Sequence, residues 1–173
     1  LTAGMDLFDS LTHTFGTMAT GGFSIKNASI GYYKSPYIHY IITVFMVLAG
    51  INFIIYFRLI TARMKDITIN SELKAYLGIF VFTTFVIALN LYLNNNYNME
   101  ESIRHASFQT ASILTTTGYS TVDFAKWPHF SQVILFTLMF IGGCSGSTAG
   151  GVKVIRIVTL FKQCINEMKA LLQ

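Results

Sequence analysis

The stretch of this sequence best suited to do chemistry is residues 115–121, Thr-Thr-Thr-Gly-Tyr-Ser-Thr. A threonine-rich run that ends in glycine and an aromatic residue can present successive backbone carbonyl oxygens to a dehydrated cation. Glycine, here Gly118, supplies the positive φ that such a backbone needs. A Thr-Gly-Tyr tripeptide between apolar segments also suits an ordinary turn. Alone, the run leaves both interpretations open.

A second copy of the pattern strengthens the cation-binding interpretation. Residues 20–24 read Thr-Gly-Gly-Phe-Ser, so that Gly118 follows Gly22 by 96 positions and Tyr119 takes the place of Phe23. A short amphipathic segment precedes each copy, at residues 7–18 and 103–114. A polar loop and a long apolar segment follow each copy. The chain therefore reads as a direct repeat of helix, loop and helix.

The composition is that of a membrane protein. Of the 173 residues, 53% are hydrophobic and only 12% are charged, which is far from a soluble domain of this length. The net charge of +4 is too small to indicate nucleic-acid binding. Cys144 and Cys164 lie in or just after apolar segments, so they do not suggest a disulfide framework. Leu1 does not begin a signal peptide, and we expect the chain to be part of a longer protein.

Segment lengths predict which parts cross the membrane. Residues 6–18 are too short and polar to span a bilayer, which needs about 20 apolar residues, and they suit a pore helix. Residues 37–57 are predicted to form the first spanning helix. Gly50 and Asn52 in its middle indicate either a close helix contact or a polar cavity. Residues 75–93 are predicted to span next, and the acidic pair at 100–101 to begin a second pore helix.

The charged residues predict an orientation. Eight of the twelve basic residues fall on one side of the predicted spans, which makes that side cytoplasmic by the positive-inside rule. They are Arg58, Arg63, Lys65, Lys74, Lys153, Arg156, Lys162 and Lys169. Asn95 is then predicted to face outside. Five acidic residues lie towards the outer mouth, where negative charge would concentrate cations: Asp6, Asp9, Glu100, Glu101 and Asp123.

The last apolar segment contains a glycine-rich stretch, residues 142–151, in which five of ten residues are glycine. Small residues four apart suit a continuous helix packed closely on a neighbour. Glycine doublets at both ends favour a break instead, because each glycine costs a helix about 0.8–1 kcal/mol. A phosphate loop is excluded, since Val152 separates Gly151 from Lys153. An unwound segment just below a filter can obstruct the ion path and act as a gate.

Four motifs together resemble a known family. They are residues 20–24, residues 46–53 (Met-Val-Leu-Ala-Gly-Ile-Asn-Phe), residues 115–121, and residues 142–156, which begin with the glycine-rich stretch. The sequence is similar to the membrane subunit of the Trk/Ktr/HKT potassium uptake superfamily, closest to the bacterial Trk type. That family has four helix, re-entrant loop, helix repeats around one pore. The resemblance covers essentially the whole chain, which matches the second repeat without its first helix, and the third repeat.

The resemblance implies a division of the chain and a set of site residues. Residues 1–58 would belong to the second repeat, 59–74 to a cytoplasmic connector, 75–161 to the third repeat and 162–173 to the start of another connector. The potassium filter would comprise Thr20, Gly21, Gly22, Phe23, Thr116, Thr117, Gly118 and Tyr119. The gating loop would comprise Gly142, Gly143, Ser145, Gly146, Ser147, Thr148, Gly150 and Gly151.

The resemblance also implies a substrate, a location and partners. Potassium would be the transported substrate, held by filter carbonyls, with no covalently bound cofactor. The protein would lie in the bacterial cytoplasmic (inner) membrane as an all-α, multi-pass protein. It would form a homodimer and rest on a cytoplasmic nucleotide-binding regulatory subunit of the TrkA kind.

Two other classes of function stay open at this point. A secondary transporter also uses broken helices around a midplane site, although many such folds have inverted repeats and the two copies here run the same way. A structural membrane subunit without a pathway would make both Thr-Gly motifs simple turns. The four histidines, His13, His39, His105 and His129, show no metal-ligand spacing, and we expect no enzyme.

Overall fold

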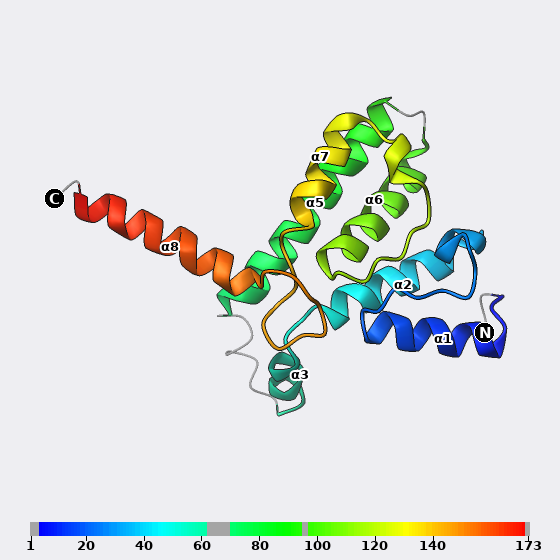
Figure 1. Cartoon of the computed structure of the whole chain (residues 1–173), viewed down its shortest axis with the longest axis horizontal. Coiled ribbons are helices and arrows are strands. Elements are labelled where there is room, and N and C mark those ends of the chain that lie inside the picture. Colours follow the sequence, from blue (N-terminus) through cyan, green and yellow to red (C-terminus); the bar gives the residue numbers. More distant parts are fainter. Residues whose placement is uncertain (1–3, 62–69, 95–96, 172–173) are drawn as a thin grey trace.

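The structure, a computed structural model, is helical and describes residues 4–61, 70–94 and 97–171. Its helices are α1 (Leu7–Met18), α2 (Pro36–Ala49), α3 (Phe53–Ile60), α5 (Ser71–Asn94), α6 (Met99–Leu114), α7 (His129–Leu138) and α8 (Val154–Leu171), with the 3-10 turns η1 (Ser29–Tyr32) and η2 (Phe124–Lys126). In Figure 1, α5, α6 and α7 lie together, α1 and α2 form a second pair that meets α6, and α8 projects away. The predicted all-α fold is confirmed.

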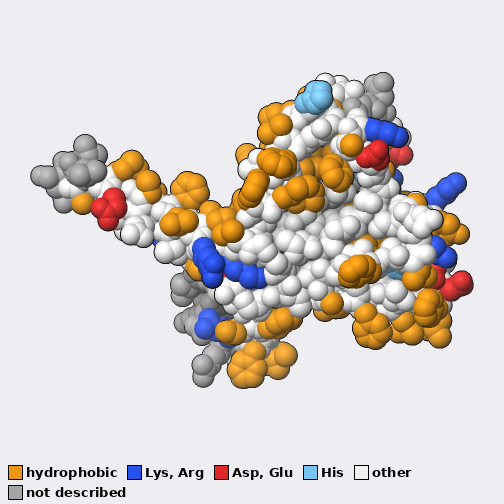
Figure 2. All heavy atoms as spheres, in the orientation of Figure 1, with side chains coloured by type: hydrophobic (Ala, Val, Ile, Leu, Met, Phe, Trp, Pro, Cys, Tyr) orange, Lys and Arg blue, Asp and Glu red, His pale blue; other side chains and the backbone are white. Residues whose placement is uncertain are grey.

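Helix α5 is the unbroken spanning helix within the described residues. Its 24 residues, at about 1.5 Å each, give about 36 Å, which exceeds the roughly 30 Å hydrocarbon core of a bilayer. It exposes large apolar side chains, with Phe82 68% and Phe85 65% accessible. Figure 2 shows apolar side chains over much of the visible surface and basic residues where α5 meets α8. This distribution suits a protein solvated by lipid and by further membrane helices.

The two predicted pore helices, α1 and α6, are too short to cross a membrane. Helix α6 begins with a capping box, in which Asn98 and Glu101 satisfy each other's backbone N–H groups. This confirms the predicted start at the acidic pair. Most of α6 is buried, including polar residues such as Thr110 and Ser112. Protein therefore covers α6, as it must cover a re-entrant helix at membrane depth.

The prediction of one continuous spanning helix over residues 37–57 is wrong. Helix α2 ends at Ala49, α3 begins at Phe53, and the two are bent by 93°. Asn52 caps α3, its Oδ1 accepting a hydrogen bond from the Ile54 N–H at 2.9 Å. The glycine-rich stretch satisfies the backbone groups at the bend: the Cys144 N–H donates to the Gly50 carbonyl at 2.9 Å, and residue 53 donates to the residue 146 carbonyl at 3.0 Å. Contacts far apart in sequence thus stabilise the break.

The predicted break in the last apolar segment is confirmed and is wider than expected. No helix covers residues 139–153, between α7 and α8. Helix α8 then continues through residue 162 without interruption, so no helix end marks the proposed boundary between the third repeat and its connector. Most of the predicted connector at 59–74, including Arg63 and Lys65, lies outside the described residues, as does Asn95.

Gly50 provides a test of this packing. A Cβ added to Gly50 would overlap the hydroxyl of the fully buried Tyr76 and would lie 2.9 Å from the Thr115 methyl carbon. We expect Gly50→Ala to destabilise the full-length protein by about 1–3 kcal/mol, because α5 must move away from α2. Gly78→Ala is the matched control, since nothing lies within 4 Å of a Cβ at Gly78 and alanine favours a helix by about 1 kcal/mol. Thermal unfolding in detergent should separate the two variants; equal melting temperatures would contradict this packing.

Candidate functional site

The two filter stretches share one unusual backbone conformation. Thr20 and Gly22 have φ of 50° and 67°, and Thr116 and Gly118 have φ of 56° and 89°. These two pairs correspond at the 96-residue offset of the sequence repeat. The glycines therefore have the positive φ that the sequence predicts. In each filter the first and third residues have a left-handed backbone. This conformation turns the peptide planes away from the pattern of a strand, as coordination of a cation by backbone carbonyls requires.

Both pore helices end in the same hydrogen-bonded motif just before the filters. In α1 the N–H of residue 21 donates to the Gly16 carbonyl at 2.8 Å and that of Thr20 to Thr17 at 3.2 Å. In α6 the N–H of residue 117 donates to residue 112 at 2.9 Å and that of Thr116 to residue 113 at 2.9 Å. These are Schellman motifs, which end a helix at a left-handed residue. Since a helix C-terminus carries partial negative charge, both helices end where a cation would be favoured.

The two filters are in direct contact. A Cβ added to Gly22 would overlap the Thr117 carbonyl oxygen. The Tyr119 ring is fully buried, and its hydroxyl lies 3.3 Å from the Phe23 carbonyl and 3.5 Å from the His13 carbonyl. The Phe23 ring, in the corresponding position of the first filter, is 83% exposed. Tyr119 therefore braces the first filter from behind.

The far end of the second filter is held by the loop that follows the first. The Gly31 N–H donates to the Ser120 carbonyl at 3.0 Å, and the Ser120 N–H donates to the Ser29 hydroxyl at 3.3 Å. A cavity of about 380 Å³ opens beside these contacts, with Asn27, Thr121 and Asp123 in its lining. Polar groups thus surround the ends of the filters away from the glycine-rich stretch.

Several of the acidic residues predicted to attract cations have partners within the protein, and Asp9 and Glu100 form the shortest ion pairs among them. The Asp9 carboxylate accepts a hydrogen bond from the Tyr33 hydroxyl at 2.5 Å and lies 3.5 Å from the Lys26 Nζ. Glu100 pairs with the Arg104 Nε at 2.9 Å, and this hydrogen bond lowers the pKa of Glu100. Their negative charge is thus largely neutralised locally, and their main effect is to fix the pore helices.

The glycine-rich stretch forms a closed loop. At its base the Gly142 N–H donates to the Val152 carbonyl at 2.8 Å, next to a β-bridge between Ile141 and Val152. A Cβ added to Gly142 would overlap the Gly150 carbonyl oxygen, so the two sides approach too closely for any side chain there. The predicted loop residues Gly142, Gly143, Ser145, Gly146, Ser147, Thr148, Gly150 and Gly151 all lie in this irregular segment.

This glycine-rich loop contacts both filters. The Thr20 hydroxyl donates to the Thr148 carbonyl at 2.9 Å. The Gly150 N–H donates to the Thr116 hydroxyl at 2.7 Å. Because Thr20 and Thr116 are the first residues of their filters, the glycine-rich loop lies against the same end of both.

Two further charged residues hold the glycine-rich loop, a role that their local sequence does not reveal. The carboxylate of Glu72, a buried residue at the start of α5, accepts a hydrogen bond from the Ser145 N–H at 2.5 Å. The Lys153 ammonium donates to the Ala149 carbonyl. In the sequence, Glu72 is simply one of the few acidic residues among the basic residues of the predicted connector. Its partner lies 73 residues away, so no local pattern reveals the contact.

The bracing role of Tyr119 can be tested with Tyr119→Phe in the full-length protein. The variant keeps the buried ring but removes the hydroxyl that reaches the Phe23 carbonyl. We expect the first filter to lose its fixed geometry, so that discrimination between potassium and sodium falls about two- to tenfold while total protein stays normal. The ratio of potassium to sodium uptake is the measurement. Tyr92→Phe, at an exposed tyrosine of α5, is the control, and equal ratios in both variants would contradict the brace.

Known proteins are similar to this chain over nearly all of its length. The profile of the family described as "TrkH: Cation transport protein" matches residues 2–172. The Trk system potassium uptake protein TrkH of Escherichia coli K12 is 43% identical over 171 residues, which cover 98% of this chain and 35% of that protein. TrkG of the same strain is 35% identical, with 98% and 35% covered.

A solved structure is similar as well. The chain superposes on the crystal structure of the potassium transporter TrkH from Vibrio parahaemolyticus with a TM-score of 0.92 and 40% identity, covering 99% of this chain and 37% of that one. The chain thus spans about a third of the length of the relatives that it matches. With a family profile matched over nearly all of its residues, this membrane protein belongs to the TrkH family of cation transport proteins.

Proposed function

We propose that the complete protein carries potassium into the cell through a pore to which this chain contributes two filters and a gate. The observation that carries the proposal is the pair of filters with matching left-handed residues, in contact with each other and with the glycine-rich loop at one end. Relatives named as potassium uptake proteins support the choice of ion.

In this proposal the carbonyls of Thr20, Gly21, Gly22 and Phe23, with those of Thr116, Thr117, Gly118 and Tyr119, replace the hydration shell of potassium. The C-terminal ends of α1 and α6 stabilise the ion through their partial negative charges. Because the filters are braced from behind and tied to η1, their carbonyls resist collapse onto a smaller ion. No side chain needs to react, so the chemistry is coordination and release.

The glycine-rich loop is proposed to be the gate. It lies against the first residues of both filters, where an ion would leave towards the predicted cytoplasmic side. Its ends are pinned by the Gly142–Val152 hydrogen bond, and its interior is held by hydrogen bonds to Glu72, to the filter threonines and to the bend between α2 and α3. Such a segment can move as a unit without unfolding α7 or α8.

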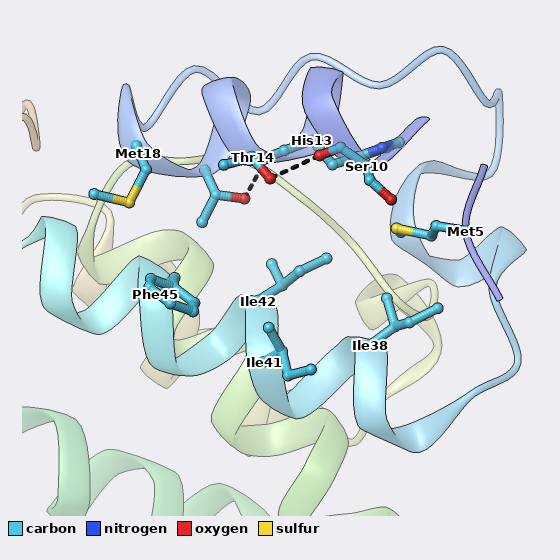
Figure 3. A pocket seen from close by; sticks show the side chains of 10 residues that line it. Met5, Ser10, His13, Thr14, Met18, Ile38, Ile41, Ile42 and Phe45 are labelled. Carbon is cyan, nitrogen blue, oxygen red and sulfur yellow. Dashed lines mark hydrogen bonds between the residues drawn. The ribbon is translucent and has the colours of Figure 1, made fainter. Parts of the chain in front are cut away.

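The proposed division into two repeats has support in a groove between α1 and α2 (Figure 3). This cavity of about 270 Å³ is lined by Met5, Ser10, His13, Thr14, Thr17, Met18, Ile38, Ile41, Ile42 and Phe45. In the other repeat α5 covers the corresponding face of α6 and α7, where Ala106, Leu114 and Leu138 belong to one buried cluster with Ile87 and Leu91. We therefore propose that a helix equivalent to α5 occupies the groove in the complete protein.

The location and partners are also proposals. The predicted cytoplasmic side carries the basic residues of α8, including Arg156 and Lys162, and supports placement in a bacterial cytoplasmic membrane. Helix α8 projects from the body (Figure 1) and exposes Leu160, Phe161 and Met168, so it needs further protein or lipid around it. A homodimer on a cytoplasmic nucleotide-binding subunit of the TrkA kind would supply such contacts.

The function is tested with the full-length protein purified into liposomes. With an outward potassium gradient, a flux assay should show potassium movement well above that of empty vesicles. Sodium movement through the same protein should be well below its potassium movement. Potassium flux no greater than in empty vesicles would favour a structural subunit. Flux that requires a sodium or proton gradient would favour the coupled transporter.

A further inference from the structure

Both pore helices place a threonine where threonine is strained. The left-handed residue of a Schellman motif is usually glycine, because a Cβ is unfavourable at positive φ. Thr20 and Thr116 occupy this position with φ of 50° and 56°. A β-branched residue at positive φ is a conformational outlier and costs about 1–3 kcal/mol. The same strain at two repeat-related positions indicates that the threonine side chain itself has a role.

The hydroxyls of these two threonines bond the glycine-rich loop directly to the filters. The Thr116 Oγ1 accepts the Gly150 N–H at 2.7 Å, 34 residues away in sequence. The Thr20 Oγ1 donates to the Thr148 carbonyl at 2.9 Å, 128 residues away. Its one hydrogen is shared with the Ala19 carbonyl at 2.7 Å. The Thr116 contact is therefore the stronger of the two.

We propose that Thr20 and Thr116 are positioning residues that latch the glycine-rich loop in its obstructing position, an inference that rests on the proposed gating role of that loop. Each threonine is both the first residue of a filter and the anchor of the loop. Displacement of the loop must break both hydrogen bonds. The position of the glycine-rich loop and the geometry of this end of the filters are thereby coupled through two side-chain oxygens.

Gly150 packs closely against Thr116, one of the two latch residues. A Cβ at Gly150 would lie 3.1 Å from the Thr116 Oγ1, which is tighter than normal van der Waals contact, while its φ lies outside the left-handed region. Gly150→Ala therefore leaves the filter sequence intact and pushes the loop away from Thr116. It provides a second route to the same effect.

The experiment compares Thr116→Val and Thr20→Val with Thr116→Ser and Thr20→Ser in the full-length protein in liposomes. Valine keeps the branched shape but loses the hydroxyl, whereas serine keeps the hydroxyl. We expect valine to raise potassium flux about two- to tenfold, and more at position 116 than at position 20. At each position serine, which keeps the hydroxyl, should raise flux less than valine does. Gly150→Ala should raise flux as Thr116→Val does.

The decisive control repeats the valine variants in a protein lacking residues 145–148. If the threonines act through the loop, valine should add nothing once deletion has raised the flux. Valine variants that lower flux or change the ion ratio equally in both backgrounds would show that the hydroxyls serve the filter alone, which overturns the latch. A raised flux on deletion with no effect of valine or of Gly150→Ala would overturn the latch and leave the gate intact. No rise on deletion would count against the gate itself.

Discussion

Replacing Gly22 by alanine is expected to abolish potassium uptake by the complete protein. The new Cβ would overlap the Thr117 carbonyl oxygen of the neighbouring filter, and the residue would also be strained at φ 67°. Gly118→Ala is expected to be milder. Among the described residues nothing lies within 4 Å of its Cβ, so only the backbone strain at φ 89°, about 1–2 kcal/mol, acts on the filter.

The measurement is growth of a potassium-uptake-deficient cell in low potassium, with membrane protein quantified in parallel. Gly21→Ala should have the smallest effect of the three, because its φ is not left-handed and its nearest neighbour, a Phe23 ring carbon, lies 3.5 Å from the Cβ. We expect growth in low potassium to fall most for the Gly22 variant, less for the Gly118 variant and least for the Gly21 variant. Full growth of both the Gly22 and Gly118 variants would remove the filter assignment, and a reversed order would contradict the contact between filters.

The filters and pore helices could be predicted because their signals are local. Gly22 and Gly118 sit at repeated positions after amphipathic segments of pore-helix length, and the structure gives both of them positive φ. The acidic start of α6 follows ordinary capping rules, which the Asn98 and Glu101 pair obeys. Length and hydropathy likewise identify α5. Each of these features depends on residues within a few turns of one another.

The missed features depend on partners far away in sequence. The bend after Ala49 is stable because the glycine-rich loop bonds its free backbone groups, and an apolar pattern alone reads as a continuous helix. Gly50 and Asn52 mark the place but also fit a close helix contact. The hydroxyls of Thr20 and Thr116 could not be assigned either, since a threonine before a filter glycine suggests carbonyl coordination and says nothing of its side chain.

Deleting residues 145–148 is expected to raise ion flux through the complete protein. The structure excludes the alternative in which this stretch is a continuous packing helix, because residues 139–153 contain no helix. The deletion removes the contacts of Ser145 with Glu72 and of Thr148 with Thr20, and also the hydrogen bonds that residues 146 and 148 make to the bend between α2 and α3. It leaves the base of the loop, where Gly142 donates to Val152 at 2.8 Å. A shorter loop can no longer fill the space at the filter ends.

The deletion also leaves the Glu72 carboxylate buried without the Ser145 N–H, which would reduce the amount of folded protein. Combining it with Glu72→Gln, which replaces the carboxylate by a neutral amide of similar shape, should restore that amount. Flux per molecule in liposomes then isolates gating from folding, with Glu72→Gln alone as the control. We expect the deletion to conduct several times more than the control at equal protein. A deletion protein present in normal amount that passes no more ions than the control would show that the glycine-rich loop does not close the path.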